Sequence, residues 1–167
     1  LPVSRRRIAP LFVCIGTNSM IPGARTKAQD LTIIEASFLN LFKFPLPVIA
    51  AVSGPALAAG FDLMVMADIR VMSETAKVGQ PEIRWALTPL SDPLWKIIGM
   101  GRAKEVTMTG RIFGAEEARE IGLANYVYPR EIYLDPAKKL AKRLRSHLEA
   151  LKPTEATVNL RPRIASP

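Results

Sequence analysis

Two carboxylic acids lie in stretches that otherwise contain small or apolar side chains. Asp62 stands two residues after the small-residue segment 56–60 (ALAAG), in an apolar turn of an expected helix, and Glu82 follows a Gly-Gln-Pro bend at residues 79–81. A carboxyl group in apolar surroundings has a raised pKa, and such a group can exchange protons near neutral pH. The pair is therefore a candidate for general acid–base catalysis.

Each acid also has a purely structural interpretation. Asp62 could interact with the dipole at the start of its helix, and Glu82 could be a surface acid or a partner for Arg84. The neighbours Ile83 and Trp85 favour a raised pKa for Glu82, because they would surround its carboxyl group with apolar side chains. Both interpretations stay open on spacing alone.

The stretch before Asp62 predicts how this acid is positioned. The apolar run at residues 47–52 is typical of a strand buried on both faces, and it ends at the Ser-Gly-Pro turn of residues 53–55. Segment 56–60 consists mainly of small residues, which allow close approach to the backbone. A helix that begins there points free N–H groups at whatever lies above it, so we expect a binding site at this helix start.

Strands and helices alternate along the rest of the chain. Short strands are expected at residues 11–15, 69–72, 76–79 and 124–128, and helices at residues 28–42, 94–100, 102–109 and 114–122. This alternation predicts an α/β fold with mostly parallel strands. A further helix is expected over residues 134–151, with an apolar stripe on one side and Lys138, Lys139, Lys142 and Arg145 mainly off that stripe.

Composition limits the classes of function. The formal net charge of +8 suits a polyanionic partner, either nucleic acid, an anionic membrane surface or a phosphate-bearing ligand, or else only a soluble surface. The single cysteine, Cys14, excludes an internal disulfide, and the single histidine, His147, argues against a structural zinc site. No apolar run approaches the ~20 residues that span a bilayer, and no signal peptide is evident. We expect one domain of a cytoplasmic protein.

Three ordered segments resemble the crotonase (enoyl-CoA hydratase/isomerase) superfamily. They read PVIAAVSGPALAAGFDL, ADIRVMSETAKVGQPEI and GRAKEVTMTGRIFGAEEAREIGLANYVYP, and the resemblance covers residues 11–129. It implies an α/β fold of the crotonase-like type, a repeated ββα spiral with C-terminal helices. Residues 1–129 would form the core, and residues 130–167 a helical region for oligomerisation or a lid. A homotrimer or homohexamer is expected.

The resemblance also implies a role for individual residues. Two backbone N–H groups polarise the thioester carbonyl of an acyl-CoA, and the matching positions are Ala24 and Ala59. Glu82 matches the acid that moves a proton at the carbon beside the carbonyl, and Asp62 stands where hydratases carry a glutamate that holds water. The residues expected to contact the substrate are Gly23, Arg25, Lys27 and Gly60. Coenzyme A would be part of the substrate, with no separate cofactor and no metal.

The sequence departs from the family pattern at several places. Residues 87–93 (LTPLSDP) replace a glycine-rich turn, and residues 1–10 offer no counterpart of the family's first strands, so the fold is expected to be N-terminally short. Asp62 is shorter than glutamate by one methylene, on the order of 1.5 Å. Alanine at position 59 is compatible with the donor role if its φ is negative.

These features lead to one main hypothesis and three alternatives. The main hypothesis is hydration of a 2-enoyl-CoA to a 3-hydroxyacyl-CoA, as in fatty acid metabolism. The alternatives are an enoyl-CoA or dienoyl-CoA isomerase, an inactive paralogue, and an RNA-binding protein that uses the basic residues 138–145. Few aromatic residues accompany those cations, so nucleic acid is the weakest of the proposed partners.

Overall fold

The fold is seen in a computed structural model of the chain. It describes residues 11–15, 41, 44, 46–89 and 91–147. Most of the helix expected at residues 28–42 and the end of the helix expected at residues 134–151 lie outside this range, as do Gly23, Ala24, Arg25 and Lys27.

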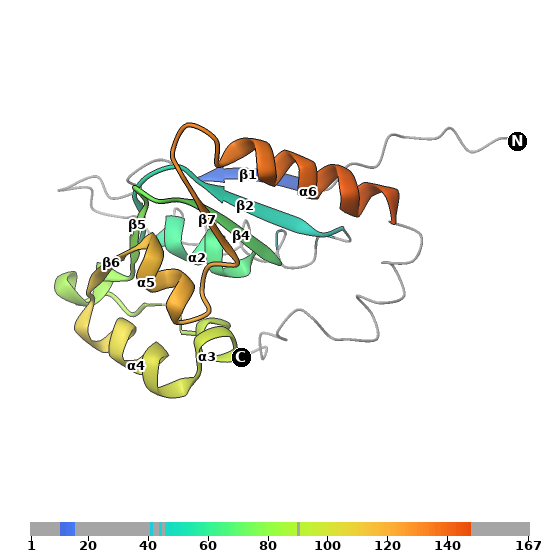
Figure 1. The fold of residues 1–167 in the computed structure, drawn as a ribbon. Coiled ribbons are helices and arrows are strands. Elements are labelled where there is room, and N and C mark those ends of the chain that lie inside the picture. Colours follow the sequence, from blue (N-terminus) through green and yellow to red (C-terminus); the bar gives the residue numbers. More distant parts are fainter. Residues whose placement is uncertain (1–10, 16–40, 42–43, 45, 90, 148–167) are drawn as a thin grey trace, which may run out of the picture.

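A four-stranded parallel sheet forms the centre of the molecule (Figure 1). Its strands lie in the order β1 (Leu11–Ile15), β2 (Val48–Val52), β4 (Ile69–Ser73) and β7 (Tyr126–Tyr128). All five residues of β2 are buried, which is why this strand reads as a continuous apolar run rather than an alternation. Full burial of a Val or Ile side chain stabilises the fold by about 1.5–3 kcal/mol, so β2 anchors the sheet.

Helices cover the two faces of this sheet (Figure 1). Successive β2 side chains point to opposite faces: Val48, Ala50 and Val52 belong to the core that includes helix α2 (Ala59–Met66). Ile49 and Ala51 pack in a second core with helix α6 (Leu134–Ser146). This part of the predicted C-terminal helical region therefore covers the sheet, while the predicted division at residue 130 stays a prediction.

A second, smaller sheet lies beside the first. It contains β3 (Ala56–Leu57), β5 (Lys77–Gly79) and β6 (Ile112–Gly114), with β3 parallel and β6 antiparallel to β5. β5 leads directly into a short 3₁₀ helix, η1 (Pro81–Trp85). The remaining helices are α3 (Leu94–Ile98), α4 (Met100–Thr109) and α5 (Ala115–Glu120).

The expected elements are largely confirmed in the described residues, with differences at their ends. The strands expected at 11–15, 47–52, 69–72, 76–79 and 124–128 and the helices at 94–100, 102–109 and 114–122 are present with small shifts. The break between α3 and α4 falls at Gly99, whose φ of 81° ends α3, rather than at Gly101. The segment 56–60, read only as small residues before a helix, contributes strand β3 as well.

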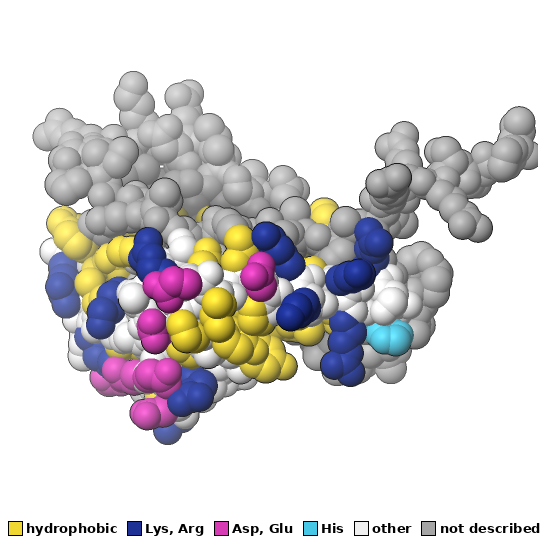
Figure 2. All heavy atoms as spheres, turned by 45° about the horizontal axis from the view of Figure 1, so that its top comes forward, with side chains coloured by type: hydrophobic (Ala, Val, Ile, Leu, Met, Phe, Trp, Pro, Cys, Tyr) yellow, Lys and Arg dark blue, Asp and Glu magenta, His cyan; other side chains and the backbone are white. Residues whose placement is uncertain are grey.

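The outer face of α6 is basic. Its exposed side chains include Lys138, Lys139, Lys142, Arg143 and Arg145, and Figure 2 shows Lys and Arg side chains gathered over this helix. Within the described residues none of the five forms an ion pair. No described helix is long and apolar enough to cross a membrane.

Candidate active site

Asp62 lies in the first turn of α2 and is almost fully buried, with 7% of its surface exposed. Its backbone N–H donates to the carbonyl of Ala58 at 3.0 Å, which begins the helix ladder. Its side chain accepts a hydrogen bond at Oδ1 from Nε2 of Gln80, at 2.7 Å. Gln80 is itself completely buried, so a donor with no access to bulk water fixes this carboxyl group.

Glu82 comes from the other side of the site, in the first turn of η1. Pro81 precedes it at a position where the missing N–H costs nothing and the fixed φ suits a helical turn. The residue is half-buried, and its Oε2 atom is inaccessible to solvent and has no hydrogen-bond partner among the described residues. A buried carboxyl oxygen without a partner favours the protonated form of the acid.

The environment raises the pKa of both acids. For Asp62, burial is the main cause and raises the pKa to about 7. The hydrogen bond from Gln80 lowers the pKa of Asp62, and the negative charge of Glu82 raises it further. Burial likewise raises the pKa of Glu82, opposed by a hydrogen bond from its own backbone. Because Asp62 responds to the charge of Glu82, the two acids act on one another through the site. Two interacting carboxyl groups with raised pKa can pass protons in both directions.

The small-residue segment provides the backbone beside these acids. Ala58 donates its N–H to the carbonyl of Gly79 at 3.1 Å, and this bond joins the start of α2 to the end of β5. Its φ of 54° and ψ of −127° lie in a region that non-glycine residues rarely adopt. Ala59 is the first residue of α2 and is not among the described residues with positive φ. A backbone donor at position 59 requires that φ there is not positive, and Ala59 meets this requirement.

The structure brings Asp62, Gln80 and Glu82 together from α2, the end of β5 and η1. Ala59 is the first residue of α2, three positions before Asp62. Gly60 is buried in the first turn of α2. The remaining expected substrate contacts, Gly23, Ala24, Arg25 and Lys27, lie outside the described residues.

Gln80 is the residue that sequence reasoning missed. The sequence indicates only a bend at residues 79–81, although a polar side chain between Gly79 and Pro81 next to a buried strand is a signal that could identify Gln80.

In the described residues no group of three His, Cys, Asp or Glu side chains is placed to hold a metal ion. The chemistry that the described side chains offer is proton transfer by two coupled acids. The N–H groups at the start of α2 lie on the same element as Asp62 and could stabilise negative charge on an oxygen.

Comparison with known proteins identifies the family. The enoyl-CoA hydratase/isomerase family profile matches residues 17–160. A short-chain-enoyl-CoA hydratase of Clostridioides difficile is 44% identical over 98 residues, which are 57% of this chain and 63% of that protein. A protein of the same name from Clostridium acetobutylicum is 31% identical over 166 residues, 91% of this chain and 64% of that protein.

Solved structures agree with the fold. An enoyl-CoA hydratase/isomerase of Cupriavidus metallidurans superposes with a TM-score of 0.72 at 32% identity, over 81% of this chain and 54% of that one. An enoyl-CoA hydratase of Bacillus anthracis superposes with a TM-score of 0.69 at 32% identity, over 73% of this chain and 50% of that one. This chain thus spans less than two thirds of the length of these relatives. With its α/β fold, its two facing acids and a profile match over most of its length, the chain belongs to the enoyl-CoA hydratase/isomerase family, the crotonase superfamily that its three sequence segments indicate.

Proposed function

We propose that this protein adds water to the double bond of a 2-enoyl-CoA and forms a 3-hydroxyacyl-CoA. The observation that carries the proposal is the pair Asp62 and Glu82, two acids with raised pKa that approach from α2 and η1. The names of its relatives, short-chain-enoyl-CoA hydratase and crotonyl-CoA hydratase, support a short acyl chain as the substrate.

The proposed reaction balances with water as the only co-reactant. Asp62 holds the water and accepts one of its protons while the oxygen bonds to C3 of the enoyl group. The π electrons of the double bond move toward C2, and negative charge collects on the thioester oxygen. Backbone N–H groups stabilise that charge, with Ala59 as one donor and Ala24 as the second. Glu82 then gives a proton to C2, and the two acids exchange one proton to return to their starting states.

The raised pKa of Asp62 suits this cycle. At a pKa of about 7 the side chain exists in both protonation states near neutral pH, so it can act as a base for water and be reset quickly. The hydrogen bond from Gln80 holds Oδ1 of Asp62 in a fixed place. This fixed position compensates in part for the aspartate side chain being shorter than glutamate.

The rest of the substrate is proposed to lie along the expected coenzyme A contacts. Arg25 and Lys27 are the cations proposed to face its phosphates, and Gly23 and Gly60 allow close approach of the backbone. No cofactor other than the coenzyme A of the substrate is proposed. We further propose that the chain works in the cytoplasm and that it forms a homotrimer or homohexamer. Sedimentation velocity of the purified protein would test the oligomeric state.

Isomerisation of the double bond is a second candidate, favoured by the aspartate at position 62. Its raised pKa leaves a substantial protonated fraction at neutral pH, and double-bond migration needs a shuttling acid but no positioned water. Separate incubations with a 2-enoyl-CoA and a 3-enoyl-CoA distinguish the two. Hydration predicts a product one water heavier from the first substrate, whereas isomerisation alone predicts that the 3-enoyl-CoA becomes a 2-enoyl-CoA and the 2-enoyl-CoA gains no water.

A further inference from the structure

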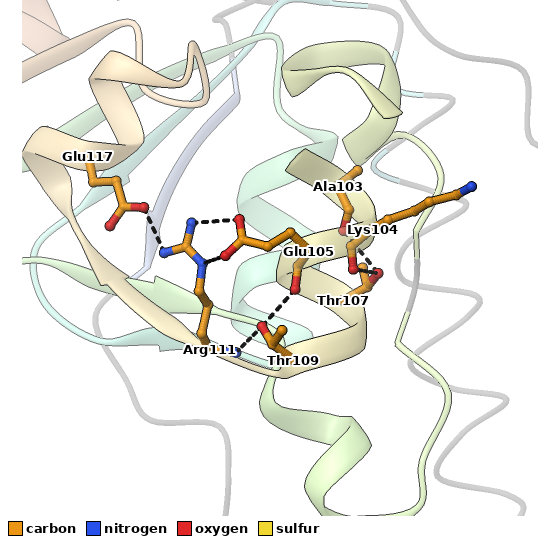
Figure 3. A network of polar contacts seen from close by, with 7 residues as sticks. All are labelled: Ala103, Lys104, Glu105, Thr107, Thr109, Arg111 and Glu117. Atoms are coloured by element: carbon orange, nitrogen blue, oxygen red, sulfur yellow. Dashed lines mark hydrogen bonds and ion pairs between the residues drawn. The ribbon is translucent and has the colours of Figure 1, made fainter. Parts of the chain in front are cut away.

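Arg111 joins the two helices α4 and α5 (Figure 3). Its guanidinium contacts both carboxylate oxygens of Glu105 in α4: Nε pairs with Oε1, and Nη2 donates to Oε2 at 3.0 Å. Its third nitrogen, Nη1, lies 2.7 Å from Oε1 of Glu117 in α5. The planar group also lies over the ring of Phe113 in β6, 4.8 Å from its centroid. One side chain thus fixes α4, β6 and α5 relative to one another.

The backbone of Arg111 is held as well. Its N–H donates to Oγ1 of Thr109 at 3.4 Å, and that hydroxyl donates to the carbonyl of Glu105 at 2.6 Å (Figure 3). Gly110 between them has a φ of 61° and ends α4 through a hydrogen bond from its N–H to Val106. Residues 109–111 therefore form a rigid corner between α4 and β6.

This corner lies directly against the segment that carries Gln80 and Glu82. A methyl group on Gly79 would overlap the carbonyl oxygen of Arg111, and a methyl group on Gly110 would lie 2.7 Å from the side chain of Ile83 and 3.4 Å from Cα of Pro81. At Gly79 the two backbones approach so closely that only glycine fits, whereas at Gly110 an added methyl group would mainly meet the side chain of Ile83, and the positive φ there also favours glycine. Residues 110–111 thus touch the site segment before Gln80 and on both sides of Glu82.

A second line of contacts leads to the other acid. The ring of Phe113, beneath the Arg111 guanidinium, meets the ring of Phe61 edge to face, with centroids 6.4 Å apart. Phe61 is fully buried in α2 and directly precedes Asp62. Both acids are therefore supported from the side of Arg111, one through the backbone of residues 79–83 and the other through a pair of aromatic rings.

We propose that Arg111 is a positioning residue: its clamp on Glu105 and Glu117 holds the 109–111 corner against residues 79–83 and so fixes Gln80 and Glu82 opposite Asp62. The role in catalysis rests on the proposed hydratase function; the role in ordering residues 79–83 does not. Arg111 touches no reacting atom, and it acts through the backbone that it supports.

The effect is expected to be local rather than a matter of overall stability. Ion pairs near the surface typically contribute little to overall stability, even though a bidentate pair within a network is the favourable case. A small displacement of the corner is more consequential for the site, because a misplacement of about 1 Å can lower a catalytic rate by up to about 100-fold.

The test compares Arg111→Met with Arg119→Met. Arg119 is a matched control, since it also pairs with a glutamate on α5, Glu116 at 2.6 Å, and this pair is more exposed than the Arg111–Glu117 pair. Amide hydrogen exchange is followed at two positions that report the site segment: Ala58, bonded to Gly79, and Leu87, bonded to Glu82. Two amides of the four-stranded sheet region, Asp68 and Asn125, report the rest of the fold.

For Arg111→Met we expect exchange at Ala58 and Leu87 to rise about tenfold, with Asp68 and Asn125 unchanged. With 2-enoyl-CoA we expect kcat to fall about tenfold while KM stays within twofold. Arg111→Lys keeps the charge but not the bidentate geometry, so its exchange rates and kcat should lie between those of the wild type and of Arg111→Met. Arg119→Met should match the wild type in both measurements. If Arg111→Met does not fold, Arg111→Lys and Glu117→Gln carry the same comparison.

Exchange that rises equally at all four amides, or not at all, would overturn the proposal, and so would an unchanged kcat in an active enzyme. If the wild-type protein hydrates no enoyl-CoA, the proposed function fails, and the exchange pattern alone still decides whether Arg111 orders residues 79–83.

Discussion

Replacing Asp62 with asparagine should stabilise the fold at neutral and alkaline pH. Burial raises the pKa of this carboxyl from an ordinary value of 3.8 to about 7, so the folded chain binds the proton more tightly than the unfolded chain. The contribution of Asp62 to stability therefore falls as pH rises from about 3.8 to about 7 and is lower by a constant amount above that range. A difference of about 3 units at 1.36 kcal/mol per unit corresponds to as much as about 4 kcal/mol.

The asparagine variant avoids this cost, because it stays neutral at every pH. It has nearly the same volume, and its amide oxygen can accept the hydrogen bond that Gln80 donates to Oδ1 of Asp62. The wild-type protein and the variant should therefore have similar stability near about pH 4, and the variant should be more stable by a few kcal/mol near about pH 8. Its hydratase activity should be lost, since an amide cannot accept a proton from water.

Urea unfolding at a series of pH values measures both curves. Asp135→Asn is the control, because Asp135 is an exposed acid in the first turn of α6 and its removal reports the general effect of one negative charge. The reasoning is refuted if Asp62→Asn and the wild type are equally stable at alkaline pH, or if the stability advantage of the variant does not grow across the pH range in which Asp62 ionises.

Three further substitutions test other parts of the site. Ala58→Gly should be about 2 kcal/mol more stable in urea than Ala59→Gly, because only position 58 has the strained positive φ that glycine relieves; equal stability would exclude the strain. Gly79→Ala should lower the melting temperature and kcat together, at a cost of about 1–3 kcal/mol, since its methyl group would meet the Arg111 carbonyl; a wild-type melting curve would contradict the close approach. Glu82→Gln should reduce kcat by at least about 100-fold with little change in KM, and full activity would remove Glu82 from the proton-transfer step.

Much of the central fold could be predicted from the sequence because apolar patterning and turn residues are local signals. The run at residues 47–52 is continuous since β2 is buried on both faces, and the Ser-Gly-Pro turn marks where it ends. Asp62 and Glu82 were identified as candidates because a lone acid in an apolar stretch is unusual. Their proximity was implied by the family resemblance and not by spacing.

Features that depend on contacts between distant segments could not be predicted. The hydrogen bond from Gln80 to Asp62 depends on how the end of β5 lies against α2, and nothing local in the sequence encodes that distance. The positive φ at Ala58 was not expected either, since alanine gives no signal of the left-handed region where glycine would. The ion pairs of Arg111 could not be predicted for the same reason, because its glutamate partners belong to two helices whose packing only the tertiary structure defines.

The central claim, that Asp62 and Glu82 together add water to an enoyl thioester, is tested most directly with isotopically labelled water. A 2-enoyl-CoA is incubated in H₂¹⁸O with the wild-type protein, Asp62→Asn, Glu82→Gln and the control Arg119→Met, and the products are weighed by mass spectrometry. The account predicts one labelled oxygen per product molecule with the wild type and the control and almost none with either acid variant. Equal labelling by all four proteins, or none by the wild type, would contradict it.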